Sequence, residues 1–149
     1  MSLLTAQLDH LAVNSPDPES IAAFYGKAMQ MRIAQGKEEE YICEGRERRM
    51  VFYPGDAKTL RYFAWNVPST TALEELKKRI EAAGIHTRPS MSPFFNDNAF
   101  TITDPDGHNL VIGHDGSNRT QHAGLPARLQ HFAFGTTHIQ PMLDFYEKT

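Results

Sequence analysis

Histidine is the residue type in this sequence that could most directly support metal chemistry. His10 lies in an apolar run over residues 8–13, and His131 lies in a similar run over residues 129–134. A neutral imidazole in such a run is either a metal ligand or a hydrogen-bonded side chain of the core. The pattern favours the core interpretation for His10 and leaves both open for His131. The remaining histidines fall in expected turns or a linker, where solvation is the simpler interpretation: His86, His108, His114, His122 and His138.

Composition excludes several other classes of function. The chain has 149 residues and a formal net charge of −3, and it has no basic stripe that would indicate a nucleic-acid partner. Its single cysteine, Cys43, excludes a disulfide framework and a multi-thiolate zinc site within one chain. No apolar run approaches the roughly 18 residues of a membrane span, and residues 1–5 do not resemble a signal peptide. We therefore expect a cytoplasmic protein with no membrane partner.

An internal repeat is the strongest pattern in the sequence. Three apolar segments share a Leu, an Ala and an intervening His or Tyr: residues 8–13, 60–65 and 129–134. A Phe-Tyr pair follows the first and third segments, at residues 24–25 and 145–146, and the two pairs are as far apart as His10 and His131. Agreement in spacing across two separate blocks indicates that one structural unit occurs more than once.

Each repeated segment is expected to be a strand that a helix follows. Asp17 is placed to cap the first helix, and the second has the capping-box pair Thr71 and Glu74 and a glycine stop at Gly84. The apolar face of the first helix is predicted to contain five residues: Ile21, Phe24, Tyr25, Ala28 and Met29. That of the second is predicted to contain four: Leu73, Leu76, Ile80 and Ala83.

Short strands joined by tight turns are expected after each of the first two helices. They are predicted at residues 31–35, 40–43, 49–53, 85–88, 99–103 and 109–113. Glu44-Gly45 is the expected turn in the first copy, and residues 104–107, Asp-Pro-Asp-Gly, are a strong hairpin signal in the second. The predicted fold class is therefore α+β: two βαβββ modules paired into one domain with a curved mixed sheet, followed by the opening βα of a third module.

These features resemble the vicinal oxygen chelate superfamily, which includes glyoxalase I, the bleomycin and fosfomycin resistance proteins and the extradiol ring-cleaving dioxygenases. The resemblance rests on the paired βαβββ order, the His of the opening strand, FYGKAMQM in the first helix and ITDPDGHNLVI in the closing hairpin. It implies a paired glyoxalase-like domain over residues 1–115, a linker over 116–127 and the truncated start of a second such domain over 128–149. A chain with more than two modules is most similar to the amino-terminal part of a type I extradiol dioxygenase, such as a catechol 2,3-dioxygenase.

The resemblance also implies a site and a reaction. In those enzymes the first module pair is metal-free, and the second holds Fe(II) with two His and one carboxylate, which leaves room for a catecholate and dioxygen. By resemblance His131 is the first metal ligand, and His10 is a weaker match in the first module. The other ligands would come from a fourth module that this sequence does not contain. The isolated chain is thus expected to be inactive and to hold no iron, whereas a full-length parent would act on a catechol-like aromatic.

A second interpretation stays open because two residues depart from the metal-binding pattern. Tyr62 occupies the place in the second module that His10 occupies in the first, and Val111 lies where metal-binding relatives often have Glu. Neither is a suitable ligand, so the chain could instead be a metal-free module that sequesters a small molecule, like the bleomycin-resistance proteins. In either case a homo-oligomer is expected, because residues 128–149 carry apolar side chains without the rest of their module.

Overall fold

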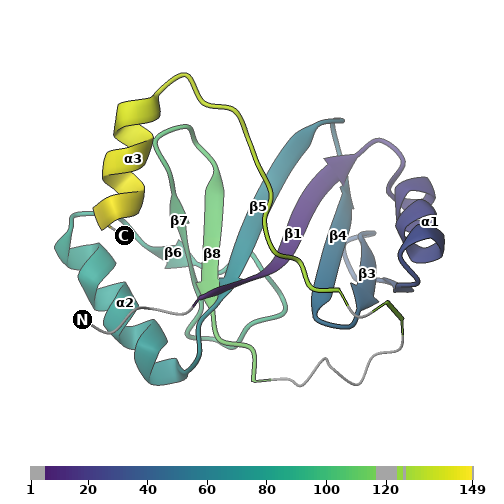
Figure 1. The fold of residues 1–149 in the computed structure, drawn as a ribbon, viewed down its shortest axis with the longest axis horizontal. Coiled ribbons are helices and arrows are strands. Elements are labelled where there is room, and N and C mark those ends of the chain that lie inside the picture. Colours follow the sequence, from purple (N-terminus) through teal and green to yellow (C-terminus); the bar gives the residue numbers. More distant parts are fainter. Residues whose placement is uncertain (1–5, 117–123, 126, 149) are drawn as a thin grey trace. The chain divides into compact units, whose positions relative to one another are not determined.

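The computed structural model describes residues 6–116, 124–125 and 127–148 (Figure 1). The elements in chain order are β1 (Gln7–Ser15), α1 (Pro18–Ala28), β2 (Arg32–Gln35), β3 (Tyr41–Gly45), β4 (Arg48–Pro54), β5 (Thr59–Asn66), α2 (Thr70–Ala82), β6 (Arg88–Pro89), β7 (Phe100–Thr103), β8 (Asn109–Gly113) and α3 (Ile139–Lys148). This is the βαβββ order, twice, that the sequence predicted. None of the described helices is long and apolar enough to cross a membrane.

The strand order shows that the two modules are equivalent. The order across the sheet is β2-β3-β4-β1-β5-β8-β7-β6. From one edge to the middle the strands are β2, β3, β4 and β1, and from the other edge they are β6, β7, β8 and β5. These are the equivalent strands of the two modules, in the same order. Strand β1 pairs with β4 in parallel, whereas β2, β3 and β4 pair antiparallel in succession, as do β6, β7 and β8. The predicted α+β class, with its mixed sheet and paired modules, is confirmed.

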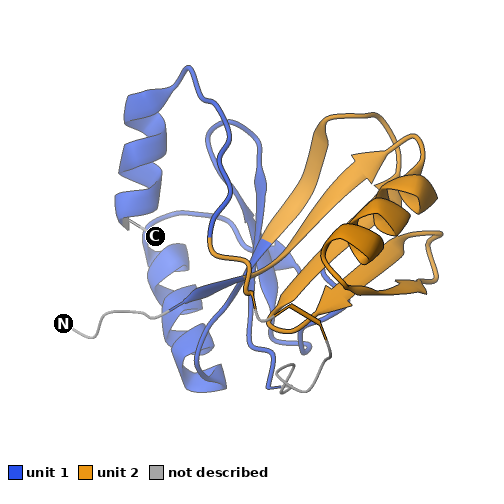
Figure 2. Cartoon of the chain, turned by 45° about the vertical axis from the view of Figure 1, so that its right-hand side comes forward, with its two compact units in different colours: residues 1–8, 64–116, 131–149 blue, residues 9–63, 117–130 orange. Residues whose placement is uncertain are grey.

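The chain divides into two compact units, shown in different colours in Figure 2. The orange unit, labelled unit 2 in Figure 2, consists of Asp9–Phe63 and Ser117–Gln130, and we call it the first unit because it contains α1. The blue unit, labelled unit 1 in Figure 2, consists of Met1–Leu8, Ala64–Gly116 and His131–Thr149, and we call it the second unit. The first unit therefore contains α1 with strands β2 to β4, and the second contains α2 and α3 with strands β6 to β8.

Helix α1 packs against the strands of the first unit through Ala22, a small buried residue. Asp17 caps the helix as predicted, since its carboxylate accepts a hydrogen bond from the backbone N–H of Ser20. Ala22 is buried in a cluster with three residues from the strand region: Met31, Cys43 and Phe52. The prediction that Phe24 faces the core is wrong, because its side chain is 65% exposed. Two residues along a helix correspond to about 200°, which places Phe24 nearly opposite Ala22.

Helix α2 begins two residues earlier than the capping-box pattern indicated. Ser69, not Thr71, is the N-cap, and its hydroxyl accepts a hydrogen bond from the backbone N–H of Ala72. The apolar face is confirmed for Leu73, Leu76 and Ile80, whereas Ala83 is exposed. Gly84 follows the helix with φ of +78°, a conformation that glycine adopts without a steric penalty, so the predicted stop is confirmed.

The two tight turns differ in how well the sequence located them. Between β3 and β4 the turn is Arg46-Glu47 instead of Glu44-Gly45, because Gly45 pairs with Arg48 and the ladder continues one residue further. That register also places Glu44 beside Arg49, a favourable cross-strand charge pair. Between β7 and β8 the predicted turn is present, with φ of +86° at Gly107.

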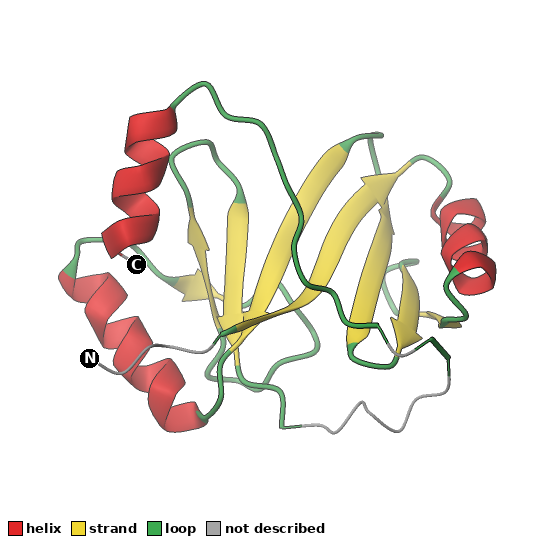
Figure 3. Ribbon diagram, in the orientation of Figure 1, coloured by secondary structure: helices red, strands yellow, loops and turns green. Residues whose placement is uncertain are grey.

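Residues 129–134 contain no strand, although the repeat predicted one there. A strand requires a hydrogen-bonding neighbour, and none of the described strands pairs with this stretch. The helix that should follow is nevertheless present as α3. In Figure 3, α2 and α3 lie on the same side of strands β7 and β8.

Candidate functional site

The first candidate site surrounds His10 in the first unit. Strand β1 carries this side chain into the interior, where it is fully buried. Its Nδ1 lies 3.1 Å from Oδ2 of the neighbouring Asp9, and its ring meets the edge of Tyr62 at a centroid distance of 5.6 Å and an interplanar angle of 88°. The sequence repeat matched His10 with Tyr62, and the two rings are in contact.

A buried ionic network extends from Asp9 toward the hairpin of β3 and β4. Nη1 of Arg49 lies 3.8 Å from Oδ2 of Asp9. The same guanidinium donates from Nε and Nη2 to Oε1 of Glu44, at 2.8 Å and 2.6 Å. The side chains of Asp9 and Arg49 are almost completely buried, so the carboxylate and the guanidinium compensate each other's loss of hydration. Oδ2 of Asp9 thereby lies beside both the imidazole of His10 and the guanidinium of Arg49.

Aromatic residues continue the site beyond His10. Tyr53 of β4 is buried, and burial raises the pKa of its phenol, which is also hydrogen-bonded to Tyr62. The guanidinium carbon of Arg61 lies 4.0 Å from the centroid of the Tyr53 ring, in cation–π geometry. Neutral phenols and a guanidinium are poor ligands for a metal ion. These groups therefore indicate a packed core here and not a metal site.

The residues of this site do not fit a divalent metal. In the part of the chain that the structure describes, no group of three or more His, Cys, Asp or Glu side chains is arranged to hold a metal ion. By resemblance a ligand would be expected at Tyr62 in the first unit and, separately, at Val111 in the second unit; both residues are fully buried, and neither side chain is a suitable metal ligand. His10 as a metal ligand stays a prediction, and the carboxylate of Asp9 lies beside its imidazole.

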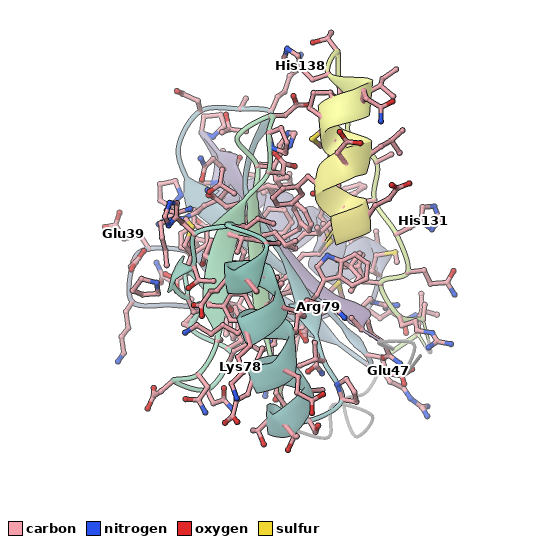
Figure 4. The ribbon with its side chains drawn as sticks, turned by 90° about the vertical axis from the view of Figure 1, so that its left-hand side faces the viewer. Glu39, Glu47, Lys78, Arg79, His131 and His138 are labelled. Atoms are coloured by element: carbon pink, nitrogen blue, oxygen red, sulfur yellow. The ribbon has the colours of Figure 1, made fainter. Side chains whose placement is uncertain are left out.

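His131 lies in the second unit, in the extended stretch before α3. Its side chain is exposed, and Figure 4 shows it at the surface. His10 and His131 thus belong to different units. The assignment of His131 as the first iron ligand stays a prediction.

A second cluster was missed by sequence reasoning. Nδ1 of His108 lies 3.0 Å from Oδ2 of Asp104, and Nδ1 of His138 lies 2.7 Å from Oδ1 of Asp106. The phenol of Tyr146 donates to Oδ2 of Asp104 at 3.0 Å. The sequence pattern favours a solvated loop residue at both histidines. His138 is indeed exposed and lies in a loop, whereas His108 is half-buried and paired with Asp104. The hairpin motif signalled the turn, but nothing local indicated that a helix more than 30 residues away would meet it.

Two groups in this cluster have shifted pKa values. The hydroxyl of Thr136 and the imidazole of His138 stabilise the carboxylate of Asp106 and hold its pKa below the usual 3.8. Burial, and then the negative charge of Asp104, raises the pKa of the Tyr146 phenol. Both shifts favour the pairing seen in the structure, an ionised carboxylate with a hydrogen-bond donor.

Two further features complete the inventory of chemical groups. The thiol of Cys43 is buried, donates to the backbone carbonyl of Ala22 at 3.5 Å and has its pKa raised to about 11 by burial. It is a core residue, as the sequence indicated, and not a nucleophile.

A surface cleft of about 430 Å³ lies between α2 and strands β6 and β7 in the second unit. Lys77 and Phe100 are among the residues that line it, and Nζ of Lys77 lies 5.7 Å from the centroid of the Phe100 ring.

The family of the chain follows from its sequence and agrees with this architecture. The model of the glyoxalase/bleomycin resistance protein/dioxygenase superfamily matches residues 7–112. The chain belongs to that superfamily. No curated protein matches the sequence.

Several solved dioxygenase structures share the fold. A catechol 2,3-dioxygenase matches with a TM-score of 0.77 and 18% identity, over 99% of this chain and 55% of its own. Homoprotocatechuate 2,3-dioxygenase from Arthrobacter globiformis matches with a TM-score of 0.74 and 16% identity, over 95% of this chain and 48% of its own. The 2,3-dioxygenase LapB from Pseudomonas sp. KL28 matches with a TM-score of 0.63 and 12% identity, over 82% and 46%. The chain therefore spans about half the length of these structures, and at such identities the likeness establishes the fold alone.

Proposed function

We propose that this chain is the amino-terminal part of an Fe(II)-dependent extradiol dioxygenase that cleaves the ring of catechol-type aromatics with dioxygen. The observation that supports the proposal most is the coverage of the catechol 2,3-dioxygenase match, 99% of this chain against 55% of that protein. A two-module protein of this superfamily would have no use for a third repeat, and α3 supplies the helix of one.

The proposal assigns distinct parts to distinct stretches of the chain. Residues 1–115 would form the paired-module domain, residues 116–127 the linker and residues 128–149 the start of a second domain. His131 would be the first iron ligand. The second His and the carboxylate would come from a fourth module that is not part of this sequence. Bound iron would orient catecholate and dioxygen together, and residues 1–149 alone would not support that chemistry.

The test compares residues 1–149 with the complete polypeptide encoded by the gene. Each is purified, loaded with Fe(II) and given catechol, and the yellow ring-opened product is followed by absorbance. We expect product from the complete polypeptide only, and we expect His131→Ala to abolish it there. His86→Ala, at another exposed histidine, is the matched control. The proposal would be rejected if the iron-loaded complete polypeptide cleaved neither catechol nor any member of a panel of substituted catechols.

A metal-free binding module is the second candidate, and specific observations favour it. Tyr62 and Val111 are fully buried at the places where ligands would be expected, and the cleft beside α2 offers about 430 Å³ to a small molecule. Equilibrium dialysis of residues 1–149 against catechol and bleomycin, with and without EDTA, separates the candidates. Stoichiometric binding that EDTA leaves unchanged would favour the binding module.

Self-association is part of the proposal. Apolar side chains are exposed in both units, among them Phe24 on α1 and Ile139 on α3, each 65% exposed. Exposed apolar groups of this size are commonly covered in an assembly. We expect light scattering to give a mass above that of one chain, whereas a monomer at high concentration would contradict this part.

A further inference from the structure

The C-terminal segment of the second unit is held by side chains instead of by strand pairing. Residues 128–135 form no strand, yet three polar contacts join the helix region to the β7–β8 turn. They are the contacts of His138 with Asp106, of Tyr146 with Asp104 and of Thr136 with Asp106. The segment is thus fastened at two carboxylates.

The turn that receives these contacts is itself well ordered. Oδ1 of Asp104 accepts hydrogen bonds from the backbone N–H groups of Asp106 and His108, at 3.0 Å and 2.8 Å. The backbone carbonyl of Asp104 accepts a third from Gly107 at 3.0 Å. Oδ2 of the same carboxylate then points to His108 and to the phenol of Tyr146. Oδ1 of Asp104 thus accepts hydrogen bonds within the turn, whereas its Oδ2 accepts one from Tyr146 of the C-terminal segment.

The second carboxylate lies at the start of α3. Asp106 contacts both Thr136 and His138, which immediately precede the helix. The positive end of a helix dipole favours a negative charge at this place. His138 is nevertheless 65% exposed, so this contact is a surface pair and is only weakly stabilising.

Apolar and aromatic side chains reinforce the polar contacts. Met142 is buried, and the ring of Phe134 lies 4.3 Å from that of His108 and 5.5 Å from that of Phe132. Two other apolar residues of the helix, Ile139 and Leu143, are exposed, at 65% and 50%. A surface segment with exposed apolar residues and no strand pairing has a low free energy of local opening.

We propose that residues 132–146 are a latch, a segment that docks on the turn formed by residues 104–108 and detaches from it while β7 and β8 stay paired. The latch is held by two side-chain contacts, of His138 with Asp106 and of Tyr146 with Asp104. The latch does not depend on the proposed ring cleavage, because every group in it lies within residues 104–146.

Hydrogen exchange measured by mass spectrometry on residues 1–149 tests the latch. Asp106→Asn is expected to speed the exchange of residues 139–146 about fivefold, because it weakens the contacts with both His138 and Thr136. His138→Ala removes only one of these contacts and should have a smaller effect, and the double variant should exchange no faster than Asp106→Asn alone. Tyr146→Phe should act on the same residues and add to the effect, since it removes a different contact. Asp97→Asn, at an exposed carboxylate of the same unit, is the matched control and should change nothing.

The readout that distinguishes a latch from general loosening is the exchange of β7 and β8. Strands that keep their wild-type protection while residues 139–146 exchange faster support the proposal. Equal acceleration in the strands would overturn it, because the segment would then open only with the sheet. Wild-type exchange of residues 139–146 in both single variants would also overturn it.

Discussion

Two imidazole–carboxylate pairs in this molecule have similar chemistry and opposite surroundings. In the first unit His10 and Asp9 are adjacent in β1 and completely buried, with Arg49 beside them. In the second unit His138 and Asp106 are 32 residues apart and His138 is largely exposed. Burial makes the loss of one partner costly, because the other must stay without water. The first pair should therefore contribute to the stability of the whole unit and the second only to the position of one segment.

Removing the buried carboxylate should have the largest effect. Asp9→Ala is expected to lower the free energy of unfolding by about 3 kcal/mol, because Arg49 and His10 stay buried without their shared partner. Urea denaturation followed by circular dichroism measures the change. Asp9→Asn keeps an acceptor for His10 and should lose less. If Asp9→Ala lowered the free energy of unfolding by less than about 0.5 kcal/mol, Asp9 and Arg49 would not form a buried ion pair in solution.

The comparison extends to two tyrosines with hydrogen-bonded phenols. Tyr62→Phe removes a buried hydroxyl and should cost about 1 kcal/mol of global stability. Tyr146→Phe removes a partly exposed one and should instead loosen α3 with little change in the unfolding midpoint. Urea denaturation gives the global value and hydrogen exchange the local one. Equal global losses would contradict the distinction between the units.

Helix capping provides a comparison in which the two modules should behave alike. Asp17→Ala and Ser69→Ala are each expected to cost about 1 kcal/mol, because each removes the acceptor for a free N–H group of a first helical turn. Thr71→Ala is the control, since the sequence pattern selected Thr71 but the structure uses Ser69; it should change stability by less than about 0.5 kcal/mol. A larger loss at Thr71 than at Ser69 would contradict the observed start of α2.

Acid should affect the exposed pair before it affects the fold, and this is the smallest effect. The docked Asp106 has a pKa below the 3.8 of a free side chain, so docking is stabilised above pH 3.8 and loses that contribution as the pH falls through the lower docked value. The titratable groups around it include His138, His108, Asp104 and Tyr146. Hydrogen exchange of α3, corrected for intrinsic rates and compared with β7 and β8, should rise below about pH 4. Asp106→Asn should remove that dependence, and an unchanged dependence would exclude Asp106 as its source.

Repetition in the sequence determined most of the fold. Copies of one apolar segment with equivalent spacing predict equivalent strands, and the strand order has the expected symmetry. The Asp17 cap, the Gly84 stop and the turn at residues 104–107 were also readable, because each depends on residues only a few positions apart. The cap at Ser69 and the turn at Arg46-Glu47 were misplaced by one or two residues, since tertiary pairing selects among neighbouring alternatives.

The sequence by itself thus determined most of the elements, the two βαβββ modules and the place of His10 in a core strand. Only the tertiary structure decided that Asp9 and Arg49 share that core, that residues 129–134 pair with no described strand, and that His138 and Tyr146 reach the β7–β8 turn. The physical reason is the range of the interactions. Strand alternation, helix periodicity and turn geometry are encoded within a few residues, whereas a carboxylate selects its partner from every donor that folding brings within about 3 Å.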